Sequence, residues 1–206
     1  IERGFMGQAV PTYIVQRGMV AGQSEMSYTT EELIAGSFTF MGLGGAQSTT
    51  SLDASPDAAT TGASMSANVN VGRIAESGVT VASPNFVRSA QISMNNNLRI
   101  LTAAGNVGGV SIGAGECAVE GTLETYFGSN AMLQKLLDGT VGNFNIRTTK
   151  NGQAIIDAVP RATFTGGSPS AGAKNQDVML PLAFMASKDA TTGAHRIINR
   201  LEYFEA

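Results

Sequence analysis

The clearest pattern in the chain is an alternation of apolar and polar residues between Cys117 and Phe127. A period of two is typical of a β-strand with one face buried and the other exposed. The apolar face carries Val119, Leu123 and Phe127, and the opposite face carries Glu120, Thr122, Glu124 and Tyr126. The segment therefore predicts a half-buried strand with an acidic, hydroxyl-bearing outer face.

Helical spacing follows directly, from Ser129 to Asp138. Its apolar residues, which share one helical face, are Met132, Leu133, Leu136 and Leu137. Ser129 or Asn130 is of the type that caps a helix start. Gly139 stands where a left-handed residue ends a helix. These signals predict one short helix.

The strand pattern recurs along most of the remaining chain and predicts an all-β fold with that single helix. The segments predicted as strands are Thr12–Val20, Ser24–Thr29, Leu33–Met41, Val69–Ile74, Phe86–Asn95, the strand beginning at Leu98, Asn143–Thr149, Ala154–Thr165, Asp177–Ser187 and His195–Phe204. Two opposed antiparallel sheets flanked by the helix fit this order. Pro160 and Pro181 fall inside strand patterns, so we expect each at an edge, at a bulge or facing away from a partner strand.

The stretch from about 44 to 66 interrupts the pattern, because it is rich in Ser, Thr, Ala, Asp and Gly and nearly lacks large apolar residues. Such a segment buries too little surface to order itself. Two interpretations are open: an arm that orders against a neighbouring subunit, or a surface insertion. The chain starts at Ile1, inside what looks like a patterned segment, and we expect a native region before it.

Composition favours an assembly subunit. Of 206 residues, 43% are hydrophobic but only 14% are charged, against roughly a quarter in typical soluble domains. Short, weakly charged side chains lose little entropy on docking. The formal net charge of −3 offers no basic footprint for nucleic acid. No apolar run approaches the roughly 20 residues that span a bilayer.

Candidate chemistry is sparse. The single histidine, His195, lies in a turn beside Arg196, and the single cysteine, Cys117, lies in a strand pattern. The glycine-rich segment 105–113 lacks the Gly-Lys-Ser/Thr of a phosphate loop. Asp53, Asp57 and Asp189 lack the spacing of a calcium loop. We therefore predict no catalytic, cofactor-binding or metal-binding residues and no cofactor.

Several short runs, taken in their order and spacing, resemble the tail tube (major tail) proteins of long-tailed, siphovirus-like bacteriophages. They are Gly121–Phe127, the helix Asn130–Gly139, Pro160–Thr165, Gly167–Pro169 and Gln176–Met179. Three runs nearer the N-terminus also resemble this family: Ile1–Phe5, Gln16–Val20 and Gly36–Gly42. The resemblance implies two packed antiparallel sheets, a β-sandwich/barrel of the phage tail tube type. We expect one domain over residues 1–206 with a long loop at about 44–66.

The resemblance also implies the function: hexameric rings stacked into a tube that conducts double-stranded DNA without binding it specifically. It implies that the tape measure, tail terminator and baseplate proteins are partners, that assembly takes place in the bacterial host cytoplasm, and that the product is a virion tail. Neither a small-molecule substrate nor membrane insertion is expected. Because Lys and Arg bind DNA phosphates, a conduit needs a neutral or acidic wall.

On that basis, candidate residues fall into two groups. The candidate lumen face is Glu120, Thr122 and Glu124, with an ordinary solvated sheet face as the equal alternative. The candidate inter-subunit contacts are Asp53, Asp57, Arg147, Arg161, Lys174 and Asp177. Loops 46–66 and 166–175 are expected to serve ring stacking.

Two other functions compete. A β-sandwich binding or decoration module of a virion would recognise glycans or a receptor, but the chain has no Trp and only 4 Tyr. A β-fold hydrolase would need a base positioned by an acid, which the single histidine makes a weak alternative.

Overall fold

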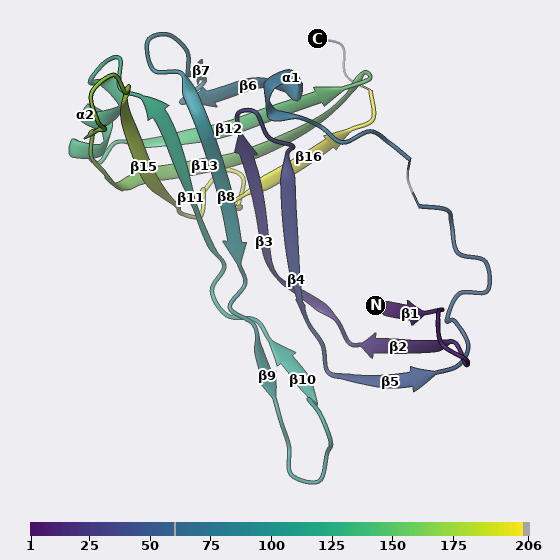
Figure 1. The fold of residues 1–206 in the computed structure, drawn as a ribbon. Helices are drawn as coiled ribbons and strands as arrows, with labels where there is room; N and C mark the ends of the chain where they lie inside the picture. Colours follow the sequence, from purple (N-terminus) through teal and green to yellow (C-terminus); the bar gives the residue numbers. More distant parts are fainter. Residues whose placement is uncertain (60, 204–206) are drawn as a thin grey trace. The chain divides into compact units, whose positions relative to one another are not determined.

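The computed structural model describes residues 1–59 and 61–203, which form sixteen strands and two short helices (Figure 1). The prediction of an all-β fold is confirmed. The described chain divides into two compact units, each assembled from three segments. Unit 1 contains residues 1–24, 38–63 and 95–116, and unit 2 contains residues 25–37, 64–94 and 117–206. Because neither unit is a contiguous stretch, no linker separates them, and a single domain over 1–206 stays a prediction.

Unit 1 contains a three-stranded antiparallel sheet, a separate two-stranded hairpin and the ends of three strands of the main sheet. The sheet has the order β1-β2-β5, and β9 pairs with β10. The bounds are β1 Glu2–Phe5, β2 Thr12–Arg17, β5 Gly44–Ser48, β9 Arg99–Leu101 and β10 Ser111–Gly113. Strands β3 (Val20–Thr29), β4 (Ala35–Met41) and β8 (Val87–Asn95) have residues in both units.

Unit 2 holds both helices and the remaining strands. They are α1 Ala67–Asn70, β6 Val71–Glu76, β7 Val79–Thr80, β11 Ala118–Tyr126, α2 Ala131–Leu137, β12 Val141–Lys150, β13 Gln153–Gly167, β14 Ser170–Ala171, β15 Val178–Ala186 and β16 Ile197–Leu201. The last predicted strand was drawn to Phe204, which lies outside the described residues. Neither helix in the described part of the chain is long and apolar enough to cross a membrane.

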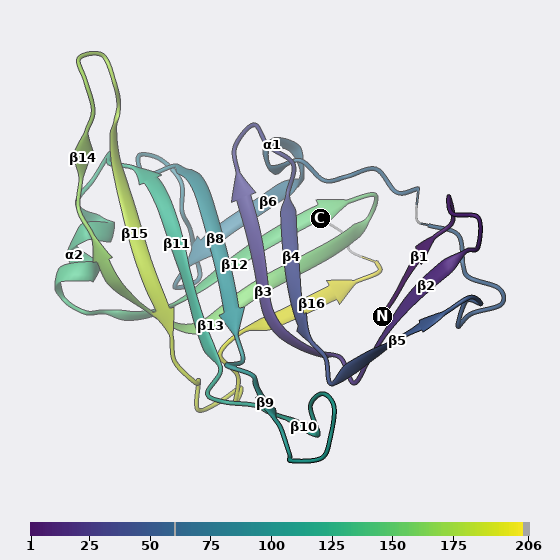
Figure 2. The ribbon, with the colours of Figure 1, turned by 60° about the horizontal axis from the view of Figure 1, so that its bottom comes forward.

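The long strand β13 joins two layers. Its first part pairs with β16, its last part pairs with β15, and β12 follows it on the other side. The sheet order is β4-β3-β8-β11-β15-β13-β12-β6-β7, so the sheet folds over at β13. Strands β8, β11 and β15 consequently cross over β12 and β13 (Figures 1 and 2). The predicted sandwich of antiparallel sheets is confirmed.

Both strand prolines occupy the kind of position that proline requires. The β12–β13 register shifts between the pairs Gly142↔Ala162 and Phe144↔Val159, which leaves Pro160 at a bulge. Pro181 faces Glu124 on β11. On the other side of β15, the pairing with β13 ends at Leu182 and the pairing with β14 involves Met179 and Val178. Pro181 therefore lies in the gap between these two pairings and interrupts neither.

The core of unit 2 lies between the two layers. β11 contributes Val119 and Leu123, both fully buried, as the alternation predicted. The facing layer contributes Ile146, and Phe144 of β12 packs against Phe184 of β15 with ring centroids 5.5 Å apart. The half-buried Cys117 packs at the margin of this core.

Helix α2 lies within the predicted segment, and Gly139 has the left-handed φ of +59° expected at its end. Of the two predicted caps, Asn130 is wrong, because it has helical dihedrals and its side chain makes no capping bond, and the hydroxyl of Ser129 instead accepts from Asn85. The distant Asn85 fixes the turn that leads into the helix. Its side-chain oxygen accepts hydrogen bonds from the backbone N–H groups of Gly128 and Ser129 at 3.0 and 2.8 Å, and its amide donates to Ser129 Oγ at 2.8 Å.

We expect Asn85→Ala to lower the free energy of unfolding by about 2–3 kcal/mol, because it leaves partly buried donors without an acceptor. Urea denaturation followed by circular dichroism measures this. Asn130→Ala is the matched control, since this exposed side chain makes no capping bond, and it should change stability by less than about 0.5 kcal/mol. Equal effects of the two substitutions would contradict the assignment.

Several local elements depart from the sequence prediction: β1, β7, β10 and β14 are additional strands, and the strand predicted over Thr12–Val20 ends at Arg17. The loop expected from about 44 begins with strand β5, whose small residues pair with β2. Helix α1 occupies the start of the strand predicted from Val69. Asn70 fixes that turn, since its side chain accepts from Ser66 N at 2.9 Å and donates to Thr149 O at 3.0 Å.

A buried ion pair attaches β16 to the core. Arg196 donates to Asp157 from Nε at 2.8 Å and from a terminal nitrogen at 2.5 Å, and both side chains are only 2% exposed. Tyr28 Oη lies 3.5 Å from the same carboxylate. Burial, together with the negative charge of Asp157, raises the pKa of Tyr28 well above its usual value. The tyrosine therefore remains a neutral donor throughout the physiological pH range.

Candidate functional site

The outward face of β8, β11 and β15, together with Glu25 of β3, forms a continuous surface in unit 2, in which carboxylates, hydroxyls and an amide from β3, β8 and β11 lie beside small apolar groups from β15. We call it the polar face. Its side chains are Glu25, Ser89, Gln91, Ser93, Glu120, Thr122, Glu124, Pro181, Ala183 and Met185. The antiparallel register of β11 and β15 brings their outward side chains next to each other: Glu120 pairs with Met185, Thr122 with Ala183 and Glu124 with Pro181. The structure thus brings all three predicted lumen residues onto one face.

Alternation explains why this face is polar while its reverse is apolar. On β11, Val119, Leu123 and Thr125 are fully buried, whereas Glu120 and Thr122 are exposed. Gly121 stands between them because a Cβ there would lie only 2.3 Å from both Gln91 O and the ring of Phe184. The glycine therefore allows the core aromatic to lie directly beneath the polar face.

Neighbouring side chains hold two of the three carboxylates in position. Gln91 Nε2 donates to Glu25 Oε1 at 2.6 Å, and Ser89 Oγ donates to Glu124 Oε2 at 3.3 Å. Arg88 approaches Glu124 to 3.8 Å, but Arg88 is exposed and Glu124 is only half-buried, so this pair adds little stability. The carboxylates are arranged as an acidic surface, with Arg88 at its end.

Two shallow hollows lie next to each other on the polar face, of about 320 and 470 Å³, and share Thr122 and Ala183. Neither is lined by a lysine or an arginine. The two hollows offer hydroxyls, small apolar groups and carboxylates, so, apart from Arg88 at the end of the face, they give a polyanion no cation to bind.

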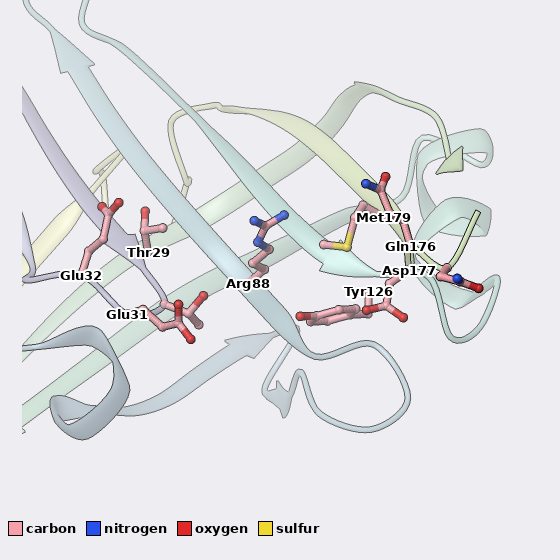
Figure 3. Close-up of a pocket in the computed structure, with 10 residues that line it drawn as sticks. Thr29, Glu31, Glu32, Arg88, Tyr126, Gln176, Asp177 and Met179 are labelled. Carbon is pink, nitrogen blue, oxygen red and sulfur yellow. The ribbon is translucent and has the colours of Figure 1, made fainter. Parts of the chain in front are cut away.

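A larger hollow of about 870 Å³ opens at one end of these strands (Figure 3). Glu31 and Glu32 lie on one side of Arg88, and Gln176 and Asp177 lie on the other. Tyr126 also lines the hollow, but no histidine or cysteine does. Within the described residues, no group of three or more His, Cys, Asp or Glu side chains could hold a metal ion. The hollow offers carboxylates around one guanidinium.

The predicted inter-subunit residues lie in both units. Asp53 and Asp57 are exposed in the loop of unit 1, where Asp53 Oδ1 accepts from Ser55 N at 2.9 Å. The others belong to unit 2: Lys174 and Asp177 in the exposed loop between β14 and β15, Arg161 beside the β13 bulge, and Arg147 on β12. Arg147 is half-buried and stands opposite Arg73 of β6. Their contacts with other copies remain predictions.

The sequence did not predict three features of this region: the places of Glu25 and Gln91 on the polar face, and the buried ion pair of Arg196 and Asp157. The alternation in β3 and β8 was visible, but which face of each strand joins β11 depends on the sheet order. The sole histidine, His195, lies in the bend before β16, next to this pair.

A protein-family model described as "Phage tail tube protein" matches residues 1–186. The match covers all of unit 1 and every strand that contributes to the polar face. Strand β16 lies beyond its end. No curated protein matches the chain.

Proposed function

The chain belongs to the phage tail tube protein family and is a structural component of a virion tail, and we propose that it forms hexameric rings stacked into a conduit for double-stranded DNA. Its function on this proposal is self-assembly, and it carries out no reaction. The family implies assembly with other copies and with other tail components.

The polar face is the observation that carries the conduit proposal. DNA binds proteins largely through phosphate neutralisation by Lys and Arg, so a wall along which DNA slides must lack them. Glu120, Thr122 and Glu124, joined by Glu25, make such a wall. We propose that this face lines the bore and that DNA passes it without specific binding.

Ring closure would use sheet edges. Identical subunits that meet through two different surfaces close into a ring when the rotation closes. Strand β4 ends one side of the main sheet and β7 the other. Asp53 and Asp57 in one loop, Lys174 and Asp177 in another, and Arg147 and Arg161 on the strands are the proposed contacts. Loops 46–66 and 166–175 would join stacked rings.

The remaining partners follow from the same proposal. The tape measure protein would occupy the bore before DNA does, and terminator and baseplate proteins would close the two ends of the tube. Assembly would take place in the bacterial host cytoplasm. Neither a small-molecule substrate nor a membrane has a role.

Negative-stain electron microscopy of the product of the complete coding sequence, across a range of concentrations, tests the proposal. Rings or tubes of uniform diameter are the expected result. A persistent monomer at high concentration would contradict it. Glycan binding by that monomer would favour the alternative of a binding or decoration module.

A further inference from the structure

Unit 1 has almost no hydrophobic core of its own. Among the described residues, Val15 is the only buried hydrophobic side chain in this unit, and all other members of the buried core belong to unit 2. Many large apolar side chains of unit 1 are exposed instead, including Phe5, Met6, Ile14, Phe38, Phe40 and Val107. Ordering a chain costs about 1–2 kcal/mol per residue, which such a core cannot offset.

Its secondary structure is of the kind that needs outside support. Three short strands form one sheet, and β9–β10 is a separate hairpin. A two-stranded hairpin is marginal in water, and a small sheet needs a covered hydrophobic face to persist. The tip of the hairpin carries Val107, which is fully exposed between Gly105 and Gly108, both with positive φ.

The most distinct apolar feature is an aromatic pair on strand β4. Phe38 and Phe40 are 62% and 45% exposed, with ring centroids 6.5 Å apart. Strand β4 ends the sheet order and contains no charged residue and no proline. Soluble proteins normally protect an exposed edge with such residues, since an unprotected edge pairs with other strands. Aromatic residues, phenylalanine included, are enriched at the cores of protein interfaces.

We propose that unit 1 acquires its core between copies, with the Phe38–Phe40 pair as the anchor buried against a second copy of the chain. This inference rests on the proposed function, because a tube requires each copy to present surfaces that other copies cover. The charges of unit 1 also favour a second copy over a lipid or nucleic acid surface. Its three arginines (Arg3, Arg17 and Arg99) are matched by four acidic residues (Glu2, Asp53, Asp57 and Glu116).

The test compares Phe38→Ser/Phe40→Ser with Phe86→Ser in the full chain. Phe86 is the matched control, because it belongs to unit 2 and is 55% exposed. Sedimentation velocity should show that the double variant needs a concentration about 30-fold higher or more to assemble. Phe86→Ser should assemble as the wild type does. Circular dichroism checks that both variants are folded.

Hydrogen exchange of the wild type provides an independent readout that needs no variant. Segments 1–24, 38–63 and 95–116 should exchange quickly in dissociated protein and slowly in assembled protein, whereas unit 2 should be protected in both. Unchanged assembly of the double variant, or slow exchange of unit 1 in dissociated protein, would overturn the inference. Failure of the wild type to assemble at any concentration would overturn the proposed function and the inference together.

Discussion

Arg196→Ala is expected to lower the free energy of unfolding by about 3–5 kcal/mol, because it leaves the carboxylate of Asp157 buried without its cation. Both side chains are 2% exposed, and two hydrogen bonds join them. The substitution should also loosen β16, which pairs with β13 through residues 154–158. Urea denaturation of the dissociated protein measures the change.

Two controls separate this effect from the loss of any arginine in this part of the chain. Arg200→Ala removes an exposed arginine from β16, the strand that follows Arg196, and should change stability by less than about 0.5 kcal/mol. Asp157→Leu combined with Arg196→Met should recover most of the loss, since an apolar pair of similar volume removes the uncompensated charge. A loss below about 1 kcal/mol for Arg196→Ala would show that the pair is not buried as described.

Glu120→Lys/Glu124→Lys is expected to leave tails intact but to reduce the infectivity of the phage by about a hundredfold or more. Each copy would present lysines to DNA phosphates along the whole bore, and the polyanion would bind where it must slide. Plaque counts and electron micrographs of phage carrying the variant measure infectivity and tail integrity separately.

Asp138→Lys/Glu202→Lys is the matched control, because both carboxylates are exposed but lie off the polar face. It changes the charge by the same amount and should leave infectivity near the wild-type level. Phosphate binding weakens steeply with salt, so the defect of the first variant should lessen at higher ionic strength. Equal infectivity of the two variants would place the polar face outside the bore.

The periodicity of apolar residues predicted the local structure well, because a strand that is buried on one side has an apolar residue at every second position. Val119 and Leu123 are buried and Glu120 and Thr122 exposed, as the pattern around them indicated. Gly139 ends α2 with the predicted conformation, since few other residues adopt positive φ so readily.

What the sequence could not predict were the contacts between distant segments. Asn85 holds the turn before α2 from more than forty residues away, a contact that the two nearby cap candidates, Ser129 and Asn130, do not reveal. Asp157 and Arg196 each look like an ordinary charged residue until β16 pairs with β13. The polar face likewise needed the order of β8, β11 and β15, which no local pattern encodes.

The most direct test is a cryo-electron microscopy reconstruction of the assembled tube at side-chain resolution. We predict a ring in which the β8–β11–β15 sheet faces the axis, with Glu120, Thr122 and Glu124 on the wall and no lysine or arginine between them. A bore lined by basic side chains, or a ring that turns these three residues toward the outside, would contradict the proposal.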